Sequence, residues 1–327
     1  MFEATQLVFY YAISPVHMGA GSAIGAIDSP IQREVHTKHP MFAGSGLKGA
    51  LRHHFNRAWP RAEGDDRKPN SLINRIFGPD TDASNFAGAL SLSDAQLVLL
   101  PVRSLKGGFA YVTSPLALAR LQRLALQARV EFKWTMPTVK ENEAAVATAS
   151  LLSTDGKQLV LEAFEFAAAK NEALADIAKW IAGFALPGDG NSFFATKLQF
   201  DLVLLHDTDF SHFARHAMVV EPHVRINDES GTADDGGLFY VENLPPETLM
   251  VGLAQASIER YKFEKETPRK REEDLLKAPE VLVEVFAGNE GEHRRGINGE
   301  LLQIGGDATI GRGLVVVQSV QPVKKES

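Results

Sequence analysis

Apolar residues alternate with polar ones, or run together in short β-branched stretches, in six segments of the chain. These segments predict strands at residues 6–13, 89–101, 198–206, 248–255, 281–286 and 314–320. Helical spacing is found elsewhere. Leu47, Leu51 and Phe55 recur every four residues behind a possible cap at Ser45, and further helices are predicted at 71–77, 114–128, 171–185 and 299–304.

Three further segments have less regular patterns. Residues 217–242 predict a long hairpin, whose turn is the polar stretch NDESGTADDGG, whereas residues 159–166 are ambiguous. The charged stretch 262–277 is typical of an exposed loop and helix. Because strand–loop–helix units recur with antiparallel-looking partners, we expect an α+β fold. Its core would be a four-stranded antiparallel sheet with two helices on one face, in the order βαββαβ with insertions.

Composition narrows the class of protein. The 327 residues contain no cysteine, which excludes disulfides, zinc–thiolate sites and cysteine nucleophiles and is typical of a reducing cytoplasm. The sequence shows no signal peptide and no apolar run near the roughly 20 residues of a membrane span, so we expect a cytoplasmic protein without a membrane partner. The net charge of −7 by itself disfavours a nucleic-acid binder.

The distribution of charge alters that conclusion. Residues 33–57 carry five basic residues against one acid, and residues 227–247 carry six acids and no Lys or Arg. One basic surface can therefore coexist with an acidic whole. Arg33, Lys48 and Arg52 are the candidates for contact with a nucleic-acid backbone. The acidic hairpin, with Asp234 and Asp235, instead disfavours contact with phosphate.

Two glycine-rich motifs could lie against a nucleic-acid backbone. In GSGLKGALR, Gly44 and Gly46 precede Lys48 at the start of a helix, where N–H groups and the helix dipole favour phosphate. GGDATIGRG contributes the second set of candidates, Gly305, Gly306, Gly311 and Arg312. Tight packing on a sheet or a simple turn would explain the same glycines. The second motif alone would also suit a protein that binds small nucleotides.

Candidate catalytic residues lie in the Gly-, Ser- and Pro-rich loop of residues 14–46 and in the hairpin. Asp28 could bind a divalent ion or orient a ribose hydroxyl, although a lone loop aspartate commonly caps a turn. His17 could act as a general acid or base. Tyr240 and Glu242 fall on one side of a strand by its period of two. The hairpin could lie over a nucleic-acid strand, with apolar side chains that wedge between bases.

Four of these stretches together resemble the RAMP proteins of CRISPR systems. They are VHMGAGSAIGAIDSPIQREVHTKHPMFAGSGLKGALR, IFGPD with VRSLKGGFAYVTSP, ESGTADDGGLFYVENLPPET and IGGDATIGRGLV. They span residues 14–318, and they are most similar to the repeated backbone subunit of the type III-B (Cmr) effector complex. The resemblance implies one RAMP domain over residues 1–327, with a ferredoxin-like (RRM-like) palm and a thumb hairpin at about 210–247.

The resemblance also implies a function. Copies would form a helical filament along a guide RNA, together with other subunits, and cut complementary target RNA at regular intervals. The family's cleaving aspartate falls on Asp28 and its histidine on His17, with Tyr240 and Glu242 at the thumb base and Lys48 on the guide. A divalent metal, Mg²⁺ or Mn²⁺, would bind at Asp28, and the ribose 2′-OH would attack the adjacent phosphate. Two alternatives stay open: an architectural subunit that never cuts, and a metal-independent endonuclease that processes guide precursors.

Overall fold

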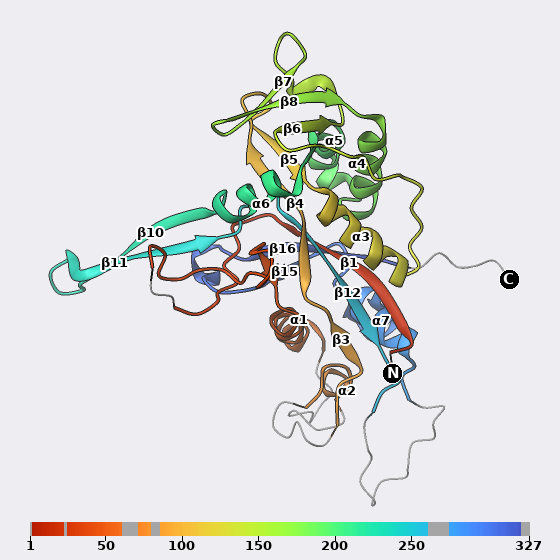
Figure 1. Ribbon diagram of the computed structural model, residues 1–327. Helices are drawn as coiled ribbons and strands as arrows, with labels where there is room; N and C mark the ends of the chain where they lie inside the picture. The colour runs from red at the N-terminus through yellow and green to blue at the C-terminus, as the bar shows by residue number, and fades with distance from the viewer. Residues whose placement is uncertain (1, 23–24, 61–70, 80–85, 261–274, 322–327) are drawn as a thin grey trace, which may run out of the picture.

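The structure is a computed structural model that describes all residues except 1, 23–24, 61–70, 80–85, 261–274 and 322–327 (Figure 1). The helices are α1 (Gly44–Ala58), α2 (Leu72–Phe77), α3 (Pro115–Gln127), α4 (Glu172–Ala185), α5 (Ser192–Asp201), α6 (Asp207–His216) and α7 (Ala278–Phe286). The strands of the first half are β1 (Ala4–Ala12), β2 (Met41–Phe42), β3 (Leu90–Leu92), β4 (Ala95–Arg103), β5 (Phe109–Thr113), β6 (Glu143–Val146), β7 (Gln158–Leu161) and β8 (Phe164–Lys170). Those of the second half are β9 (Leu202–Leu205), β10 (Val219–Ile226), β11 (Ala233–Asn243), β12 (Leu249–Ala256), β13 (Gly288–Asn289), β14 (Arg294–Arg295), β15 (Glu300–Gln303) and β16 (Leu314–Val320).

One large mixed sheet organises the molecule. Its strand order is β15-β16-β1-β12-β4-β5-β9-β6-β8-β7, with β2 on β4 and β3 on β12. The run β16-β1-β12-β4 is antiparallel throughout, whereas β5–β9 and β6–β8 are parallel pairs. The expected α+β class is confirmed, and the sheet is much larger than the four expected strands.

The alternation of residues in β1 separates two hydrophobic cores. Val8 and Tyr10 join the core that contains Leu51 of α1 and Val285 of α7. Leu7 and Phe9 point to the opposite face and join the core under α3 and α4. Because successive side chains of a strand point to opposite faces, one strand buried on both sides serves both cores. This explains why β1 reads as a continuous apolar run.

Several local predictions are confirmed, including the helices at 171–185 and 114–128. The Asn171 side chain accepts a hydrogen bond from the Leu174 amide at 3.1 Å, and Ser114 caps α3 ahead of Pro115. Helix α1 begins at Gly44, not after Ser45. In place of a side-chain cap of its own, the Gly44 amide donates to Asp94 Oδ1 at 2.8 Å. The ambiguous segment 159–166 forms the turn and flanks of the β7–β8 hairpin.

The strand predicted at 281–286 is wrong, because these residues belong to helix α7. Its buried positions Ala278, Val281 and Val285 have helical spacing, and Glu280 caps the start by accepting from the Lys277 amide at 2.8 Å. The helix predicted at 299–304 is wrong as well. It is strand β15, which pairs with β16 and buries Leu302 while exposing Leu301. In both cases the tertiary partner overrides a short local pattern.

The strand predicted at 198–206 is partly wrong. Helix α5 continues to Asp201, supported by an ion pair from Lys197 to Asp201 one turn away, and β9 keeps four residues. The predicted exposed stretch 262–277 lies largely outside the described residues. Within the described part of the chain, no helix is both long and apolar enough to span a bilayer.

The hairpin predicted at 217–242 is confirmed as β10–β11, which projects well away from the sheet (Figure 1). Its register pairs Val220 with Glu242 and Glu221 with Val241. Helix α6 leads into β10, and β11 returns through residues 244–248 to β12 at the centre of the sheet. The hairpin is therefore rooted in the middle of the fold, beside the end of β1.

Candidate active site at the hairpin base

The loop that follows β1 runs along the base of the hairpin (Figure 1). Val16 exchanges two backbone hydrogen bonds with Leu244, each 2.9 Å. Further along, the Ser29 amide donates to the Tyr240 carbonyl at 3.1 Å, and the Glu242 amide donates to the Ser29 carbonyl at 3.0 Å. This loop therefore forms a third, irregular strand on the edge of β11 opposite to β10. Long loops can be ordered in this way because their backbone groups find partners.

Asp28 lies at the start of this pairing. Its Oδ2 accepts a hydrogen bond from the Tyr240 amide at 2.7 Å, and the side chain is exposed. One carboxylate oxygen is therefore fixed to the hairpin while the group as a whole faces solvent. An exposed charge held at a defined position, rather than a cap within a turn, is the arrangement expected for a group that meets a ligand.

His17 lies two residues further along the same edge of β11. Its Nδ1 is 2.7 Å from the Glu242 carbonyl oxygen. A carbonyl only accepts, so Nδ1 carries a proton, and in the neutral tautomer that this contact favours Nε2 holds the lone pair. Tyr240 and Glu242 are separated by about 6.6 Å along an extended strand. The points at which β11 holds Asp28 and His17 are therefore two residues apart.

Glycines keep the space around the His17 ring clear. A Cβ at Gly19 would lie 2.8 Å from Nε2, and a Cβ at Gly306 would lie 3.4 Å from Cδ2. The main chain of His17 is fixed from the same side: its carbonyl accepts from the Gly306 amide at 2.8 Å, and a Cβ at Gly305 would be 2.2 Å from that oxygen. Gly305 also has φ +71°. The second glycine motif therefore contacts His17 directly.

Glu242 is buried, with 4% of its surface exposed. Its Oε2 accepts from the Ile31 amide at 3.0 Å, and its Oε1 pairs with the Arg33 guanidinium at 2.5 Å. The side chain thus ties the loop to the hairpin, and its own carbonyl fixes His17. The structure places Glu242 beneath the site, whereas Tyr240 is 37% exposed.

A second buried ion pair secures the same loop to the rest of the molecule. Arg120 of α3 donates to Glu34 at 3.1 and 2.9 Å, and both residues are about nine-tenths buried. His39 Nε2 lies 2.9 Å from Ser211 Oγ in α6, and burial lowers the pKa of His39 to about 4. Because a buried charge is tolerated only where it is paired and hydrogen-bonded, these contacts fix Glu34 against α3, and the hydrogen bond of His39 ties the same part of the loop to α6.

One face of the hairpin exposes apolar side chains in a row. By register, Val220, Val224, Leu238 and Tyr240 share a face, and each is between 37% and 54% exposed. On the other face Phe239 stacks on His223, with ring centroids 5.4 Å apart. Exposed aliphatic and aromatic side chains on a projecting hairpin are typical of a surface that contacts another molecule.

The predicted RNA-binding cations all have intramolecular partners. Lys48 Nζ donates to the Leu90 carbonyl at 2.8 Å, and burial, with the charges of Arg52 and Arg260, lowers its pKa. Arg52 donates to Asn74 Oδ1 at 2.6 Å. Arg312 pairs with Glu221. Their role in RNA contact stays a prediction, since partly buried cations can still face a ligand.

Gly44 has a packing role. A Cβ there would lie 2.3 Å from the Leu92 carbonyl oxygen, so α1 approaches β3 closely. Gly46 and Gly311 are exposed, and a Cβ at Gly311 would meet open space. Around the start of α1 lies a hollow of about 500 Å³ lined by Ser45, Lys48, Phe77, Phe86 and Arg260, among others. This hollow combines cationic and aromatic side chains.

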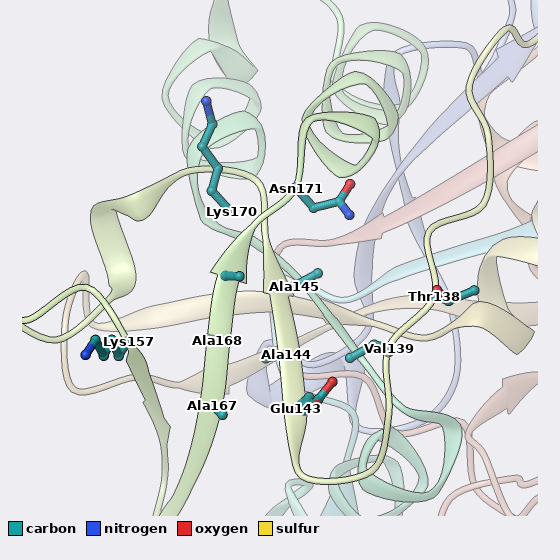
Figure 2. Close-up of a pocket in the computed structure, with 11 residues that line it drawn as sticks. Thr138, Val139, Glu143, Ala144, Ala145, Lys157, Ala167, Ala168, Lys170 and Asn171 are labelled. Carbon is teal, nitrogen blue, oxygen red and sulfur yellow. The ribbon is translucent and has the colours of Figure 1, made fainter.

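Figure 2 shows a second hollow, of about 460 Å³, over the alanines of β6 and β8. Lys157, Lys170 and Asn171 line it together with Ala144 and Ala168, which Figure 2 labels on β6 and β8. It belongs to the opposite part of the sheet from β1 and β16. None of the candidate site residues lines it.

The site offers few ligands for a metal ion. Among the described residues, no three His, Cys, Asp or Glu side chains come together as a metal-binding group. Asp28 supplies a single exposed carboxylate. Mg²⁺ commonly keeps several waters and binds through one or two carboxylates plus substrate phosphates, so Asp28 fits an ion that RNA would help to hold.

Sequence reasoning missed Gly19, Ser29 and Glu221 as parts of this site. Ser29 takes part through backbone pairing with Val241, about 210 residues away along the chain. Glu221 takes part through its ion pair with Arg312, 91 residues away. A glycine two positions after His17 was a visible signal for Gly19. Local sequence gave no signal for the other two.

Comparison with known proteins identifies the family to which this sequence is similar. A family model for the RAMP superfamily matches residues 9–316. The CRISPR system Cmr endoribonuclease Cmr4 of Pyrococcus furiosus is 35% identical over 315 residues, which cover 95% of this chain and 94% of that protein. The CRISPR system Cms endoribonuclease Csm3 of Streptococcus thermophilus is 27% identical over 160 residues, covering 44% and 73% respectively.

Solved structures agree. Oligomeric Cmr4 from Pyrococcus furiosus superposes with a TM-score of 0.66 at 29% identity, covering 97% of this chain and 99% of that one. A chain of the type III-B Cmr-beta complex bound to cognate target RNA superposes with a TM-score of 0.65 at 18% identity, covering 97% and 98%. The second likeness concerns the fold alone.

Proposed function

Because the chain belongs to the RAMP superfamily and is a homologue of the endoribonuclease Cmr4, we propose that it is the target-cleaving backbone subunit of a type III-B CRISPR effector complex. It would bind guide RNA as one copy of a helical filament, beside the complex's other subunits, and cut complementary target RNA at regular intervals. The observation that carries this proposal is the exposed Asp28 carboxylate, anchored on the hairpin edge beside His17.

The architecture supports a ferredoxin-like palm. The strands β16-β1-β12-β4 with helices α1 and α7 follow the chain order β1-α1-β4-β12-α7-β16, which is βαββαβ. Helices α1 and α7 pack into the same hydrophobic core. In this interpretation the β10–β11 hairpin is the thumb, and the whole chain is one domain with insertions.

The hairpin and the palm would have different tasks. The exposed apolar row with Leu238 and Tyr240 would press against bases of a guide–target duplex. The start of α1, with Gly46, Lys48 and Arg52, would follow the guide backbone. Sequence would be read by base pairing with the guide, while the protein holds the shape of the duplex. The oligomeric state of a solved Cmr4 relative supports the contact between copies.

The chemistry would use the RNA's own nucleophile. The 2′-OH beside a displaced nucleotide attacks the adjacent phosphorus, its proton passes to a base, and the bond to the 5′ oxygen breaks as that oxygen gains a proton. The products are a 2′,3′-cyclic phosphate and a 5′-OH. DNA lacks the 2′-OH and would not be cut. The lone pair at His17 Nε2 suits the role of base, and the Asp28 carboxylate would orient the RNA at the reacting phosphate.

A divalent ion fits this site through Asp28. When bound, Mg²⁺ or Mn²⁺ would neutralise charge on the reacting phosphate. The Tyr240 amide holds one oxygen of Asp28, so the carboxylate is oriented before any ion arrives. The hydroxyl of Tyr240, on the exposed hairpin face, would contact the RNA backbone.

The test compares the assembled complex containing wild type or Asp28→Ala on an end-labelled target RNA, with Mg²⁺, Mn²⁺ or EDTA. Asp176→Asn, an exposed aspartate on α4, serves as the control. We expect regularly spaced cuts that disappear in Asp28→Ala and in EDTA, with target binding retained.

Other outcomes are equally informative. Full cutting by Asp28→Ala would leave this chain as an architectural subunit. Cutting that survives EDTA would favour the metal-independent guide-processing reaction, in which His17 is the general base.

A further inference from the structure

Two glutamates at the base of the hairpin point to its opposite faces. Glu221 on β10 is opposite Val241, and Glu242 on β11 is opposite Val220, so the two occupy adjacent rungs of the ladder. Successive rungs direct their side chains to alternate faces. Each carboxylate is bound by an arginine from a different loop.

Arg33 holds the face that carries Glu242. Its guanidinium donates to Glu242 Oε1 at 2.5 Å, to the Lys38 carbonyl at 2.7 Å and to the Ala214 carbonyl at 2.8 Å. Ala214 lies in the last turn of α6, and only residues 217 and 218 join that helix to β10. The Arg33 guanidinium therefore contacts both chain segments at the base of the hairpin, β11 through Glu242 and the approach to β10 through Ala214.

Arg312 holds the other face. Its Nη2 lies 2.7 Å from both Oε1 and Oε2 of Glu221, which also accepts from Asn243 Nδ2 at 3.3 Å. Arg312 belongs to the loop between β15 and β16, and Gly306 of that loop donates to the His17 carbonyl. The loop thus joins the hairpin to the backbone of His17.

These partners change the interpretation of both arginines. The Arg33 side chain is 18% exposed and Arg312 23%, and both charges are already matched by carboxylates. A guanidinium is suited to such planar, multiple hydrogen bonding, which a lysine would not reproduce. At least one guanidinium nitrogen of each arginine is therefore committed to a carboxylate of the hairpin.

We propose that Arg33 and Arg312 are positioning residues, which clamp the hairpin base from its two faces and so fix the hairpin relative to Asp28 and His17. This proposal rests on the proposed function, in which the hairpin presents target RNA to those residues. A displacement of about 1 Å at a reacting centre can lower a rate by roughly 100-fold, so the clamp sets which phosphate is cut and how fast.

A charge exchange tests the clamp at its more accessible pair. Arg312→Glu and Glu221→Arg are made singly and together, and the assembled complex is tested for the position and rate of target cleavage. Each single variant is expected to cut roughly 10- to 100-fold more slowly, with cuts at additional positions. The double variant is expected to regain the wild-type pattern, because it restores the ion pair in reverse.

The same variants separate the clamp from direct RNA binding. If Arg312 binds a phosphate, its loss lowers the slope of log affinity against log salt by about 0.7 to 0.9, and the exchange does not restore cleavage. That result would overturn the proposal. Arg295→Glu is the matched control, since Arg295 pairs with Glu300 of β15, which lies outside the hairpin.

Hairpin orientation gives a readout that does not depend on cleavage. The chain has no cysteine, so Glu229→Cys near the hairpin tip and Gln127→Cys at the end of α3 allow two specific spin labels. The distance distribution is expected to broaden in Arg312→Glu and to narrow again in the exchange variant. An unchanged distribution in Arg312→Glu would refute the clamp. Absent cleavage in every sample, with the expected distances, would refute the proposed function and leave the clamp standing.

Discussion

The imidazole of His17 is held by the main-chain oxygen of Glu242, 2.7 Å from Nδ1, and not by the Glu242 carboxylate. That carboxylate is buried and occupied by Ile31 and Arg33. Two residues that the sequence placed together as catalytic candidates therefore have different tasks. One presents Nε2 as a lone pair, and the other fixes the ring and the loop around it.

Gly19→Ala is predicted to impair cleavage without unfolding the protein. The added methyl would lie 2.8 Å from His17 Nε2, so it would displace the ring or cover its lone pair. We expect a loss of about 10-fold or more in the cleavage rate, typical of a mispositioned base. The measurement is single-turnover cleavage of a target RNA by the assembled complex.

Gly25→Ala is the control in the same loop, because a Cβ there meets nothing within 4 Å. It should leave the rate unchanged. Equal rates for Gly19→Ala and wild type would show that Nε2 takes no part in the reaction.

Arg33→Gln is predicted to lower the free energy of unfolding by about 3–5 kcal/mol, because Glu242 would remain buried without its charge partner. Arg295→Gln removes a pair whose arginine is 79% exposed and should cost about 0–1 kcal/mol. Urea unfolding of both variants gives the comparison. If Arg33→Gln lowered the free energy of unfolding as little as Arg295→Gln does, the Glu242 carboxylate would have to be well hydrated.

Gly305→Ala and Gly311→Ala separate close packing from backbone conformation. Both glycines have positive φ, 71° and 80°, so each alanine bears a similar strain of about 1–2 kcal/mol. Only at 305 would the Cβ also meet the His17 carbonyl, at 2.2 Å, whereas 311 faces open space. We expect Gly305→Ala to have the lower melting temperature and to lose cleavage. Equal melting temperatures would argue against a close approach of this loop to His17.

His39 makes stability sensitive to acid. Burial lowers its pKa to about 4, opposed by Glu34 and Asp207 and helped by Arg120 and Arg215. Between about pH 6.5 and 4 the unfolded imidazole binds a proton that the folded one does not, so the free energy of unfolding falls as the pH falls through this window. Denaturant unfolding at several pH values should show a shallower slope for His39→Gln. An unchanged slope would assign the acid sensitivity to other groups.

The sequence by itself determined the elements with strong local signals. The apolar run of β1, the capped helices α3 and α4 and the hairpin with its polar turn were all predictable, because caps, periodicity and turn chemistry act within a few residues. The wrong predictions concern two short segments. Residues 281–286 of α7 were predicted to be a strand, and the segment that contains β15 was predicted to be a helix. There the identity of the neighbouring element decided the conformation.

Only the tertiary structure decided what the site residues do. Arg33 and Arg312 carry the same charge in any conformation, yet only the fold places Glu242 and Glu221 against them, which is the basis of the proposed clamp. The tautomer of His17 likewise depends on a carbonyl 225 residues away. Contacts of this kind come from the register between β11 and the loop after β1. Local sequence does not encode that register, because it is set by how the whole sheet buries its apolar faces.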